Sequence, residues 1–229
     1  MRKKENIETI YAAALKIFAK FGYQKATVED IAKTMNMTKG NLYLYVKNKK
    51  ALYRETVSWA LQKWQFRVAT AVDRETDVKR RFEVMCFKAV EYLSQDDHLR
   101  RVLIHDPEIF PMFPEKDPFE EINQNSVLMI KTILEQGIEE KAFRNVNTER
   151  VSEIIFLIYK MFIIRTYIQR ETEFMQQVFA ETVELVTHGL FMESHLMDLE
   201  KTGTSPLGME RIPHIISDNE TGQKKEVCE

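Results

Sequence analysis

Hydrophobic residues recur at helical spacing along most of the chain, beginning with two short segments near its N-terminal end. The first covers residues 5–21 and is followed by Gly22, a residue that readily takes the left-handed conformation at a helix C-terminus. The second begins at Thr27, where the order Thr-Val-Glu-Asp matches a capping box that ends in aspartate. Asn36, which tolerates positive φ, separates it from a third segment that Thr38 can cap. This pattern predicts two short helices joined by a tight turn, a helix-turn-helix.

Longer periodic segments fill the remainder of the chain. Asn48 can cap a fourth helix that ends near Val72. Residues 106–118 contain four prolines and are predicted to be irregular, and beyond Lys201 the chain is polar, as is typical of a flexible tail. Further helices are predicted over about residues 75–94, 97–105, 118–141, 148–169 and 172–196. The predicted fold is therefore all-α, with an N-terminal three-helix unit that contains the helix-turn-helix and a larger C-terminal helical unit.

The formal net charge of −2 hides a strong asymmetry along the chain. Residues 1–55 carry 12 lysines and arginines against 5 acidic residues, whereas the remainder carries 21 against 30. A basic N-terminal quarter on an acidic body indicates a polyanionic partner for that quarter alone. Charge by itself leaves open the alternative that these lysines are simply solvated.

The third predicted helix, which starts at Lys39, has an apolar side and a polar side. At 100° per residue, Leu42 and Val46 fall on one side and can pack on the first two helices. A helix of two turns is unstable alone, so this docking must hold it in place. The opposite side presents Gly40, Asn41, Leu44 and Tyr45, with Lys39 and Tyr43 on its flanks.

The polar side of this helix carries groups that suit duplex DNA. Asn41 can hydrogen-bond a base edge, Gly40 allows a close approach, and Leu44 can contact a thymine methyl group. The hydroxyls of Tyr43 and Tyr45 can reach phosphate or base, although both rings could instead pack within the small domain. The neighbouring lysines add attraction to the phosphate backbone.

Residues 21–52, FGYQKATVEDIAKTMNMTKGNLYLYVKNKKAL, resemble the DNA-binding domain of the TetR family of bacterial transcription regulators. The shared motifs are T-V-x-D-I-A in the second helix, K-G-x-L-Y-x-Y in the third and K-N-K-x-x-L at the start of the fourth. The chain departs from the family at Asn36, where Gly is usual, and at Val46, where Phe is common. The resemblance implies phosphate contacts by Thr38, Tyr43 and Lys49, and major-groove contacts by Lys39, Gly40, Asn41, Leu44 and Tyr45, with Thr27 as a further candidate DNA-binding residue.

The most apolar part of the chain, residues 151–167, is hydrophobic on nearly every side and must therefore be buried on every side. One layer of helices cannot easily provide that burial, so either a second subunit covers one face or the monomer has a large core. The resemblance implies the first arrangement, a homodimer in which helices about 148–169 and 172–196 of each subunit form a four-helix bundle.

Methionine and phenylalanine are frequent in the predicted C-terminal unit and could line an adaptable apolar pocket, although such residues are often plain core. The resemblance implies release of DNA on binding a small molecule, and the residue types suggest an apolar or amphipathic effector such as a fatty acyl compound, an aromatic or a drug-like cation. The proline-rich residues 106–118 are a candidate gate. The candidate ligand-binding residues are Met85, Phe110, Met112, Phe113, Phe119, Met129, Met161 and Phe162.

Catalytic functions and metal sites are disfavoured. The chain has no Gly-rich phosphate loop, no nucleophile elbow and no paired-cysteine zinc spacing, so neither an enzyme nor a bound cofactor is expected. Two sets of residues could in principle hold a metal ion, but neither has tight ligand spacing. These sets are Asp97, His98, His105 and Asp106, and His188 with His195.

A cytoplasmic location is expected. The N-terminal MRKKENIETI lacks the apolar stretch of a secretory signal, and residues 154–164 are too few to span a bilayer and include Lys160. Cys86 and Cys228 lie far apart and indicate no disulfide framework.

These observations predict three parts: a helix-turn-helix DNA-binding domain over residues 1–47, an effector-binding and dimerisation domain over 48–200, and a flexible tail over 201–229. The predicted function is a ligand-responsive transcriptional regulator, most simply a repressor that binds a palindromic operator as a dimer. An activator, an effector-independent repressor or a helical protein-interaction module are the alternatives.

Overall fold

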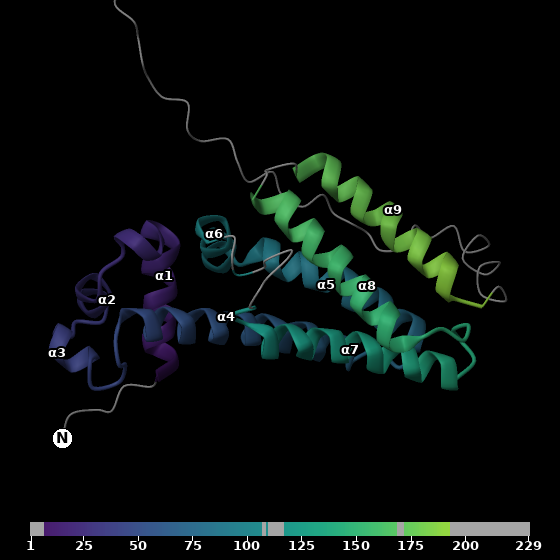
Figure 1. The fold of residues 1–229 in the computed structure, drawn as a ribbon, viewed down its shortest axis with the longest axis horizontal. Helices are drawn as coiled ribbons and strands as arrows, with labels where there is room; N and C mark the ends of the chain where they lie inside the picture. The colour runs from purple at the N-terminus through teal and green to yellow at the C-terminus, as the bar shows by residue number, and fades with distance from the viewer. Residues whose placement is uncertain (1–6, 107–108, 110–116, 169–171, 193–229) are drawn as a thin grey trace, which may run out of the picture.

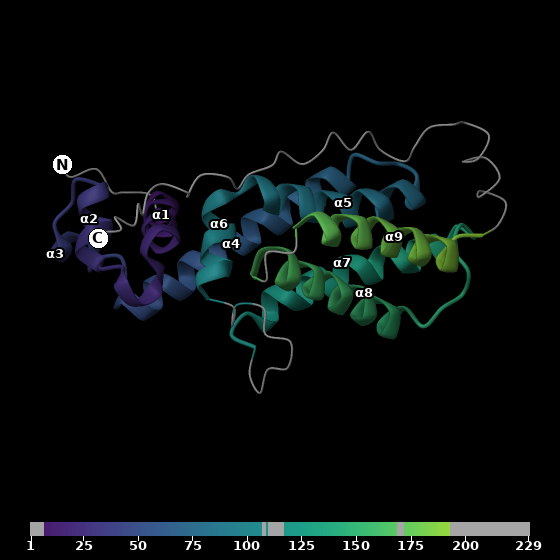
Figure 2. The same ribbon diagram turned by 90° about the horizontal axis from the view of Figure 1, so that it is seen from above.

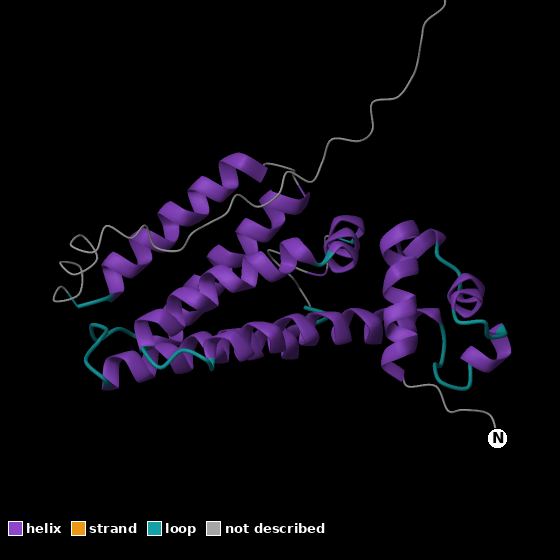
Figure 3. Ribbon diagram, turned by 180° about the vertical axis from the view of Figure 1, so that it is seen from behind, coloured by secondary structure: helices purple, strands orange, loops and turns teal. Residues whose placement is uncertain are grey.

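A computed structural model describes residues 7–106, 109, 117–168 and 172–192. Within these ranges the chain consists of helices and loops, which confirms the all-α prediction (Figure 3). The predicted tail over residues 201–229 lies outside the described residues.

The N-terminal unit, α1–α3, contains α1 (Ile7–Lys25), α2 (Val28–Thr34) and α3 (Lys39–Leu42), and it lies at one end of the long helix α4 (Lys49–Val72) (Figure 1). Its core is formed by fully buried side chains contributed by all four helices. They include Ile10, Phe18, Ile31, Leu42 and Leu52.

The body, α5–α9, surrounds the far part of α4. It contains α5 (Val78–Gln95), α6 (Asp97–His105), α7 (Glu120–Glu139), α8 (Thr148–Ile163) continued by the π-helix η2 (Ile164–Ile168), and α9 (Thr172–Leu190). α4 packs mainly on α5, and α7 packs mainly on α8. Figures 1 and 2 both show α8 and α9 side by side, with α6 placed between α1 and the rest of the body.

Local signals in the sequence set most helix ends. Gly22 (φ 70°) and Asn36 (φ 53°) both have the predicted positive φ, although the ψ of 166° at Gly22 is more extended than in a left-handed helical cap. The chain resumes helical geometry after Gly22, however, so α1 extends to Lys25 instead of ending at residue 21. The side chain of Asn48 accepts the Ala51 N–H at 2.8 Å, as expected for the cap of α4.

The cap of α2 differs from the expected capping box. The Thr27 hydroxyl accepts the Asp30 backbone N–H at 3.0 Å, as predicted. The Asp30 carboxylate accepts a hydrogen bond from the same hydroxyl, and not from the Thr27 backbone as in a reciprocal box. One hydroxyl therefore makes both bonds, which fixes its direction.

The end of α9 is tied to the loop between α7 and α8. Phe143 and Phe191 stack with ring centroids 5.0 Å apart, and the Arg144 N–H donates to the Leu190 carbonyl at 2.9 Å. The Phe143 ring also fills the space above Gly137, where a Cβ atom would lie 2.1 Å from a ring carbon. Glycine is therefore required at this point of α7.

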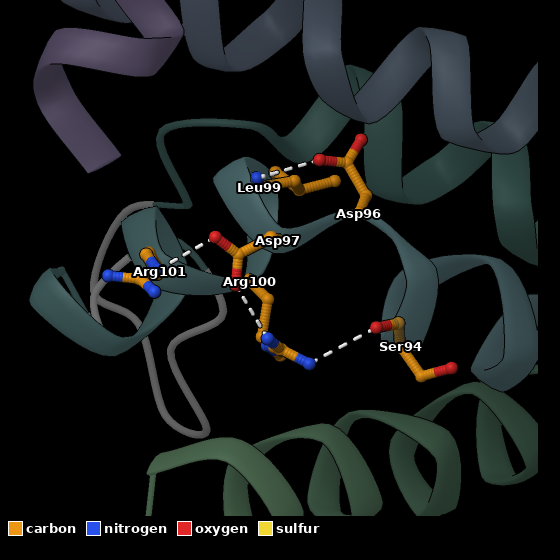
Figure 4. Close-up of polar contacts among 6 residues, drawn as sticks. All are labelled: Ser94, Asp96, Asp97, Leu99, Arg100 and Arg101. Atoms are coloured by element: carbon orange, nitrogen blue, oxygen red, sulfur yellow. Dashed lines mark hydrogen bonds and ion pairs between the residues drawn. The ribbon is translucent and has the colours of Figure 1, made fainter. Parts of the chain in front are cut away.

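α6 is held to α5 by polar contacts around its first turn (Figure 4). The Asp96 carboxylate caps α6 by accepting the Leu99 N–H at 3.0 Å. Asp97 pairs with both Arg100 and Arg101, and Arg100 also donates to the Ser94 carbonyl of α5 at 3.1 Å. These contacts fix the start of α6, and α6 packs on α1.

α1, α4 and the end of α6 meet at Tyr53. Its ring lies 4.9 Å from the ring of Phe18 and 4.8 Å from that of Tyr23, measured between centroids. Its hydroxyl donates to the Asp106 carboxylate at 2.6 Å, and burial together with this carboxylate raises the pKa of Tyr53, so the hydroxyl remains a donor. The N-terminal unit and the body therefore share one aromatic and polar contact point.

Candidate nucleic-acid interface and effector cavity

The third helix is held from its inner side and exposed on its outer side. Leu42 and Val46 are buried, as their spacing predicted. Leu44 is 78% exposed and Tyr43 is 42% exposed, whereas Tyr45 is half-buried against the core. An exposed leucine beside buried neighbours leaves a rigid surface with an apolar contact still to make.

α3 is shorter than predicted. Only Lys39–Leu42 is α-helical, and the next residues form a tighter turn in which the Tyr45 N–H donates to the Leu42 carbonyl at 3.0 Å. The turn is shortened because Val46 has to return to the core and Asn48 has to cap α4. The sequence pattern could not show that the end of α3 and the start of α4 compete for the same residues, because α3 and α4 each have the expected local signals.

Gly40 lies exposed in the first turn of α3, and no intramolecular contact requires a glycine there. A Cβ atom at this position would meet only the Thr38 hydroxyl, at 4.0 Å. Glycine destabilises a helix by up to about 1 kcal/mol relative to alanine, and no contact within the chain compensates for this loss at Gly40. Close approach by another molecule is a reason for it.

The remaining polar candidates fall into two groups. Thr27 and Thr38 are exposed, and each accepts a backbone N–H from the residue three positions on, so both hold helix starts. Lys39 is exposed and Asn41 is half-buried. All of these except Thr27, together with Gly40, Tyr43, Leu44 and Tyr45, lie on α3 or directly beside it. Thr27 lies at the start of α2 instead.

Lys49 is placed differently from the other candidates. Its ammonium donates to the Gln24 carbonyl at 3.1 Å and lies 4.6 Å from the centroid of the Tyr23 ring. It therefore ties the end of α1 to the start of α4 in the unbound chain. A phosphate contact by Lys49 remains a prediction and would have to share the ammonium with these partners.

A second site lies in the body, where a cavity of about 80 Å³ is enclosed by α4, α5, α7, α8 and α9. This is larger than one water molecule needs and smaller than the roughly 150 Å³ that accommodates benzene. Among the described residues, no Asp, Glu, Lys or Arg side chain lines it. Its main wall residues are Trp64, Gln65, Phe82, Met85, Met129, Ile155, Phe156, Tyr159, Phe179 and Val183.

Polar contacts at the cavity are few and are fixed. The Gln65 amide donates to the Ile122 carbonyl and to the Ser126 hydroxyl, both at 2.6 Å. The Trp64 indole donates to the Ala89 carbonyl at 3.0 Å. These bonds attach α4 to α7 and α5, so a ligand that widened the cavity would act directly on α4.

Sequence reasoning located only part of this cavity. Met85 and Met129 lie in its wall, whereas Phe119, Met161 and Phe162 lie outside it. Phe110, Met112 and Phe113, with most of the candidate gate over residues 106–118, lie outside the described residues. Wall residues on all five helices were missed, because nothing in the periodicity separates a cavity wall from a packed core.

The side of the body formed by α8 and α9 carries unburied apolar side chains. On α9, Phe174 and Leu185 are 60% and 74% exposed, and Met192, just beyond the end of the helix, is 45% exposed. On α8, Ile154 and Leu157 are about half exposed. This surface, defined as the α8–α9 face, is the one that the sequence assigned to a second subunit.

The residues considered for a metal site are engaged elsewhere. Both carboxylate oxygens of Asp97 pair with arginines (Figure 4). Asp106 accepts a hydrogen bond from the Tyr53 hydroxyl. His188 contacts the Glu184 carbonyl at 2.8 Å, and His195 lies outside the described residues. Within the described ranges, no three His, Cys, Asp or Glu side chains come together as a metal site, and no helix is long and apolar enough to cross a membrane.

The chain is similar to known regulators in sequence and in fold. It is 23% identical to the uncharacterized HTH-type transcriptional regulator YhgD of Bacillus subtilis over 150 residues, 66% of this chain and 78% of that one. A TetR transcription regulator from Haloarcula marismortui superposes with a TM-score of 0.70 at 19% identity, covering 80% of this chain and 97% of the other. The transcriptional regulator FadR from Bacillus subtilis, solved with stearoyl-CoA, gives a TM-score of 0.66 at 18% identity, covering 80% and 99%.

The N-terminal unit and the start of α4 carry the family assignment. Residues 10–56 match the family described as bacterial regulatory proteins, tetR family, and this range includes the whole of α2, α3 and their turn. The similarity to solved structures extends the shared fold through the body. The chain therefore carries a DNA-binding domain of the tetR family of bacterial regulatory proteins, and as a whole it is similar to known transcriptional regulators in sequence and in fold.

Proposed function

We propose that this regulator is a repressor that binds a pseudo-palindromic operator as a homodimer and is released by a small effector bound in the body. The observation that carries this proposal is the surface of α3, where Leu44 is exposed beside the buried Leu42 and Val46. In a two-fold symmetric dimer, two such helices would enter successive major grooves about 34–36 Å apart. Lys39, Gly40, Asn41, Leu44 and Tyr45 would face the bases, and Thr27, Thr38, Tyr43 and Lys49 would face the phosphate backbone.

The α8–α9 face supports the dimer. Phe174 and Leu185 are eleven residues apart, close to three helical turns, so they project in nearly the same direction. Exposed apolar side chains on two adjacent helices match what an intersubunit four-helix bundle would bury. One domain over residues 1–47 would then contact DNA and one over 48–200 would dimerise and bind the effector.

The cavity supports the effector. It is apolar, enclosed by five helices and crossed by α4, the helix whose first turns hold Tyr53 and the N-terminal unit. FadR from Bacillus subtilis has a similar fold and was solved with an acyl thioester, which favours an effector with an apolar chain. At about 80 Å³ the cavity would have to widen to admit such a chain, and α4 forms part of its wall.

Coupling between the two sites would act through α4. A ligand can shift the dimer only by binding one arrangement more tightly than the other. Widening the cavity would move Trp64 and Gln65 away from their partners on α5 and α7, and α4 would carry the displacement to Tyr53 and its contact with Asp106. The separation of the two α3 helices would then no longer match the operator.

The experiment that tests DNA recognition compares two exposed residues on the same chain. Leu44→Ala is expected to lower the affinity for DNA upstream of the regulator's own gene by about tenfold, because it loses an apolar base contact worth about 1–3 kcal/mol. Phe66→Ala, at a position 72% exposed on α4, is the matched control and should bind as the native chain does. Fluorescence anisotropy at fixed salt measures both, since affinity depends steeply on ionic strength.

Equal binding by the native chain and Leu44→Ala would contradict the assignment of α3 as the reading element. In vitro transcription from the bound fragment then tests the direction of regulation. Reduced transcript on addition of the protein supports a repressor, and increased transcript would identify an activator instead.

A further inference from the structure

Lys160 is a charged residue in the interior of the body. It lies on α8 and is 5% exposed, in a segment whose other side chains are almost all apolar. Within the part of the chain that the structure describes, its ammonium has no ion pair and no hydrogen bond. An ammonium so placed costs several kcal/mol of solvation unless a partner restores it.

The ammonium lies beside the cavity. It is 5.7 Å from the centroid of the Phe156 ring, and both Phe156 and the preceding residue, Tyr159, line the cavity wall. The contact with the ring face is a weak cation–π interaction that compensates for only part of the lost solvation. Lys160 itself does not line the cavity, but its positive charge lies next to Phe156, a residue of the α8 wall.

Two carboxylates lie near enough to influence Lys160 without bonding to it. Burial lowers the pKa of Lys160, whereas Asp117 and Glu153 act in the opposite direction through their negative charges. Because burial is the larger effect, the two carboxylates do not make up for the water that the ammonium loses, and neither forms an ion pair with it. A single further anion would compensate the ammonium, but a doubly charged group would also be repelled by Asp117 and Glu153.

We infer, on the basis of the effector role proposed above for the cavity, that the effector is an amphipathic carboxylate. Its apolar chain occupies the cavity and its carboxylate forms an ion pair with Lys160. A cationic amphiphile would find no carboxylate in the described cavity wall and would face the Lys160 charge. An apolar pocket alone would permit acyl, aromatic or cationic ligands, and the charge of Lys160 favours the acyl carboxylate among them.

The experiment uses four ligands with the same eight-carbon chain: octanoate, octanol, octylamine and octyl phosphate. Calorimetry on the full-length protein is expected to give a dissociation constant for octanoate about 10–100-fold lower than for the other three. The same order should hold for the concentration that releases the protein from its DNA.

Three variants assign the effect to Lys160. Lys160→Met should bind octanoate no more tightly than octanol, whereas Lys160→Arg, which keeps the charge, should retain the preference for octanoate. Lys63→Met, at an exposed lysine of α4, is the matched control and should bind like the native chain. Circular dichroism confirms that each variant is folded.

The outcomes separate this inference from the proposed function. If octanoate and octanol bind equally, or if Lys160→Met retains the octanoate preference, the charge inference is wrong while the cavity can still bind an effector. Tighter binding of octyl phosphate or octylamine would overturn the carboxylate assignment. If none of the four binds the native chain while DNA binding is intact, the effector part of the proposed function fails, and this inference fails with it.

Discussion

At the scale of single residues, Gly40 and Lys160 are the two positions whose chemistry the isolated chain does not need. Gly40 occupies a place where a side chain would fit, and Lys160 occupies a place where an apolar side chain would fit better. Residues that lower stability without a structural reason are most often found at functional sites. For each of these two residues, we therefore expect a substitution that keeps or raises the stability of the fold and weakens DNA binding or effector binding.

Gly40→Ala is expected to leave the thermal unfolding midpoint unchanged or raise it slightly, because alanine favours a helix by up to about 1 kcal/mol. The same change should weaken DNA binding by about tenfold or more, since the added methyl group would lie on the surface that approaches the groove. Thermal denaturation and anisotropy on one preparation measure both effects. Unaltered DNA binding would show that Gly40 is not at the interface.

Lys160→Met is expected to raise the free energy of unfolding at pH 7 by about 1 kcal/mol or more, because it replaces a buried charge by an apolar chain of similar length. Burial lowers the pKa of Lys160 in the folded state, so the native chain recovers this deficit as pH rises through that lowered pKa. The difference between the two proteins should therefore be smaller at pH 10 than at pH 7. Urea denaturation at both pH values measures it, and a difference that grew with pH would contradict this account.

At the scale of elements, the fixed end of α9 determines which face of that helix remains outside. The contact of Phe143 with Gly137 and Phe191 holds the C-terminal end of α9 against α7. Helix boundaries followed from local signals such as Asn48 and Asp96, which act within three or four residues. The docking of α9 follows from contacts some fifty residues apart in the chain, which periodicity does not encode.

Gly137→Ala should destabilise the protein by about 2 kcal/mol or more, because its methyl group would overlap the Phe143 ring. Gly189→Ala is the matched control: a Cβ there would meet only an Arg144 nitrogen at 3.6 Å, an ordinary contact, so stability should be unchanged or improved. Chemical denaturation compares them. Combining Gly137→Ala with Phe143→Leu should recover part of the loss, and simple additivity would contradict a direct clash.

At the scale of the whole molecule, the function proposed above places the DNA contact and the effector in different parts of the chain, so it requires that α4 connect them and that two subunits act together. α4 is the element shared by the N-terminal unit and the cavity, and the α8–α9 face is the apolar surface suited to a partner. The position of the proposed DNA-binding surface was predictable, because it lies within one sequence segment. The cavity wall comes from α4, α5, α7, α8 and α9, and the sequence located only part of it. Their connection through Tyr53 and Asp106 joins residues more than fifty positions apart and required the structure.

Leu185→Glu is expected to convert the dimer to a monomer at micromolar concentration, because it places a charge in the interface proposed for the α8–α9 face. Leu128→Glu, at a position 59% exposed on α7, is the matched control and should leave the dimer intact. Sedimentation equilibrium measures the mass of each. A dimeric Leu185→Glu variant with undiminished operator affinity would locate the interface elsewhere.

The sequence alone determined where most helices lie, the caps at Thr27, Thr38 and Asn48, the positive φ of Gly22 and Asn36, and the outward side of α3, because each depends on residues only a few positions apart. It also indicated a DNA-binding domain of the tetR family, through a contiguous motif in the N-terminal unit. The tertiary structure decided that α3 is a single helical turn, that Lys49 is bound to α1, and which apolar residues enclose a cavity. It also revealed that one lysine in an apolar run is buried beside that cavity. These features depend on how segments far apart in the sequence pack against one another, and the spacing of residues along the chain does not predict that packing.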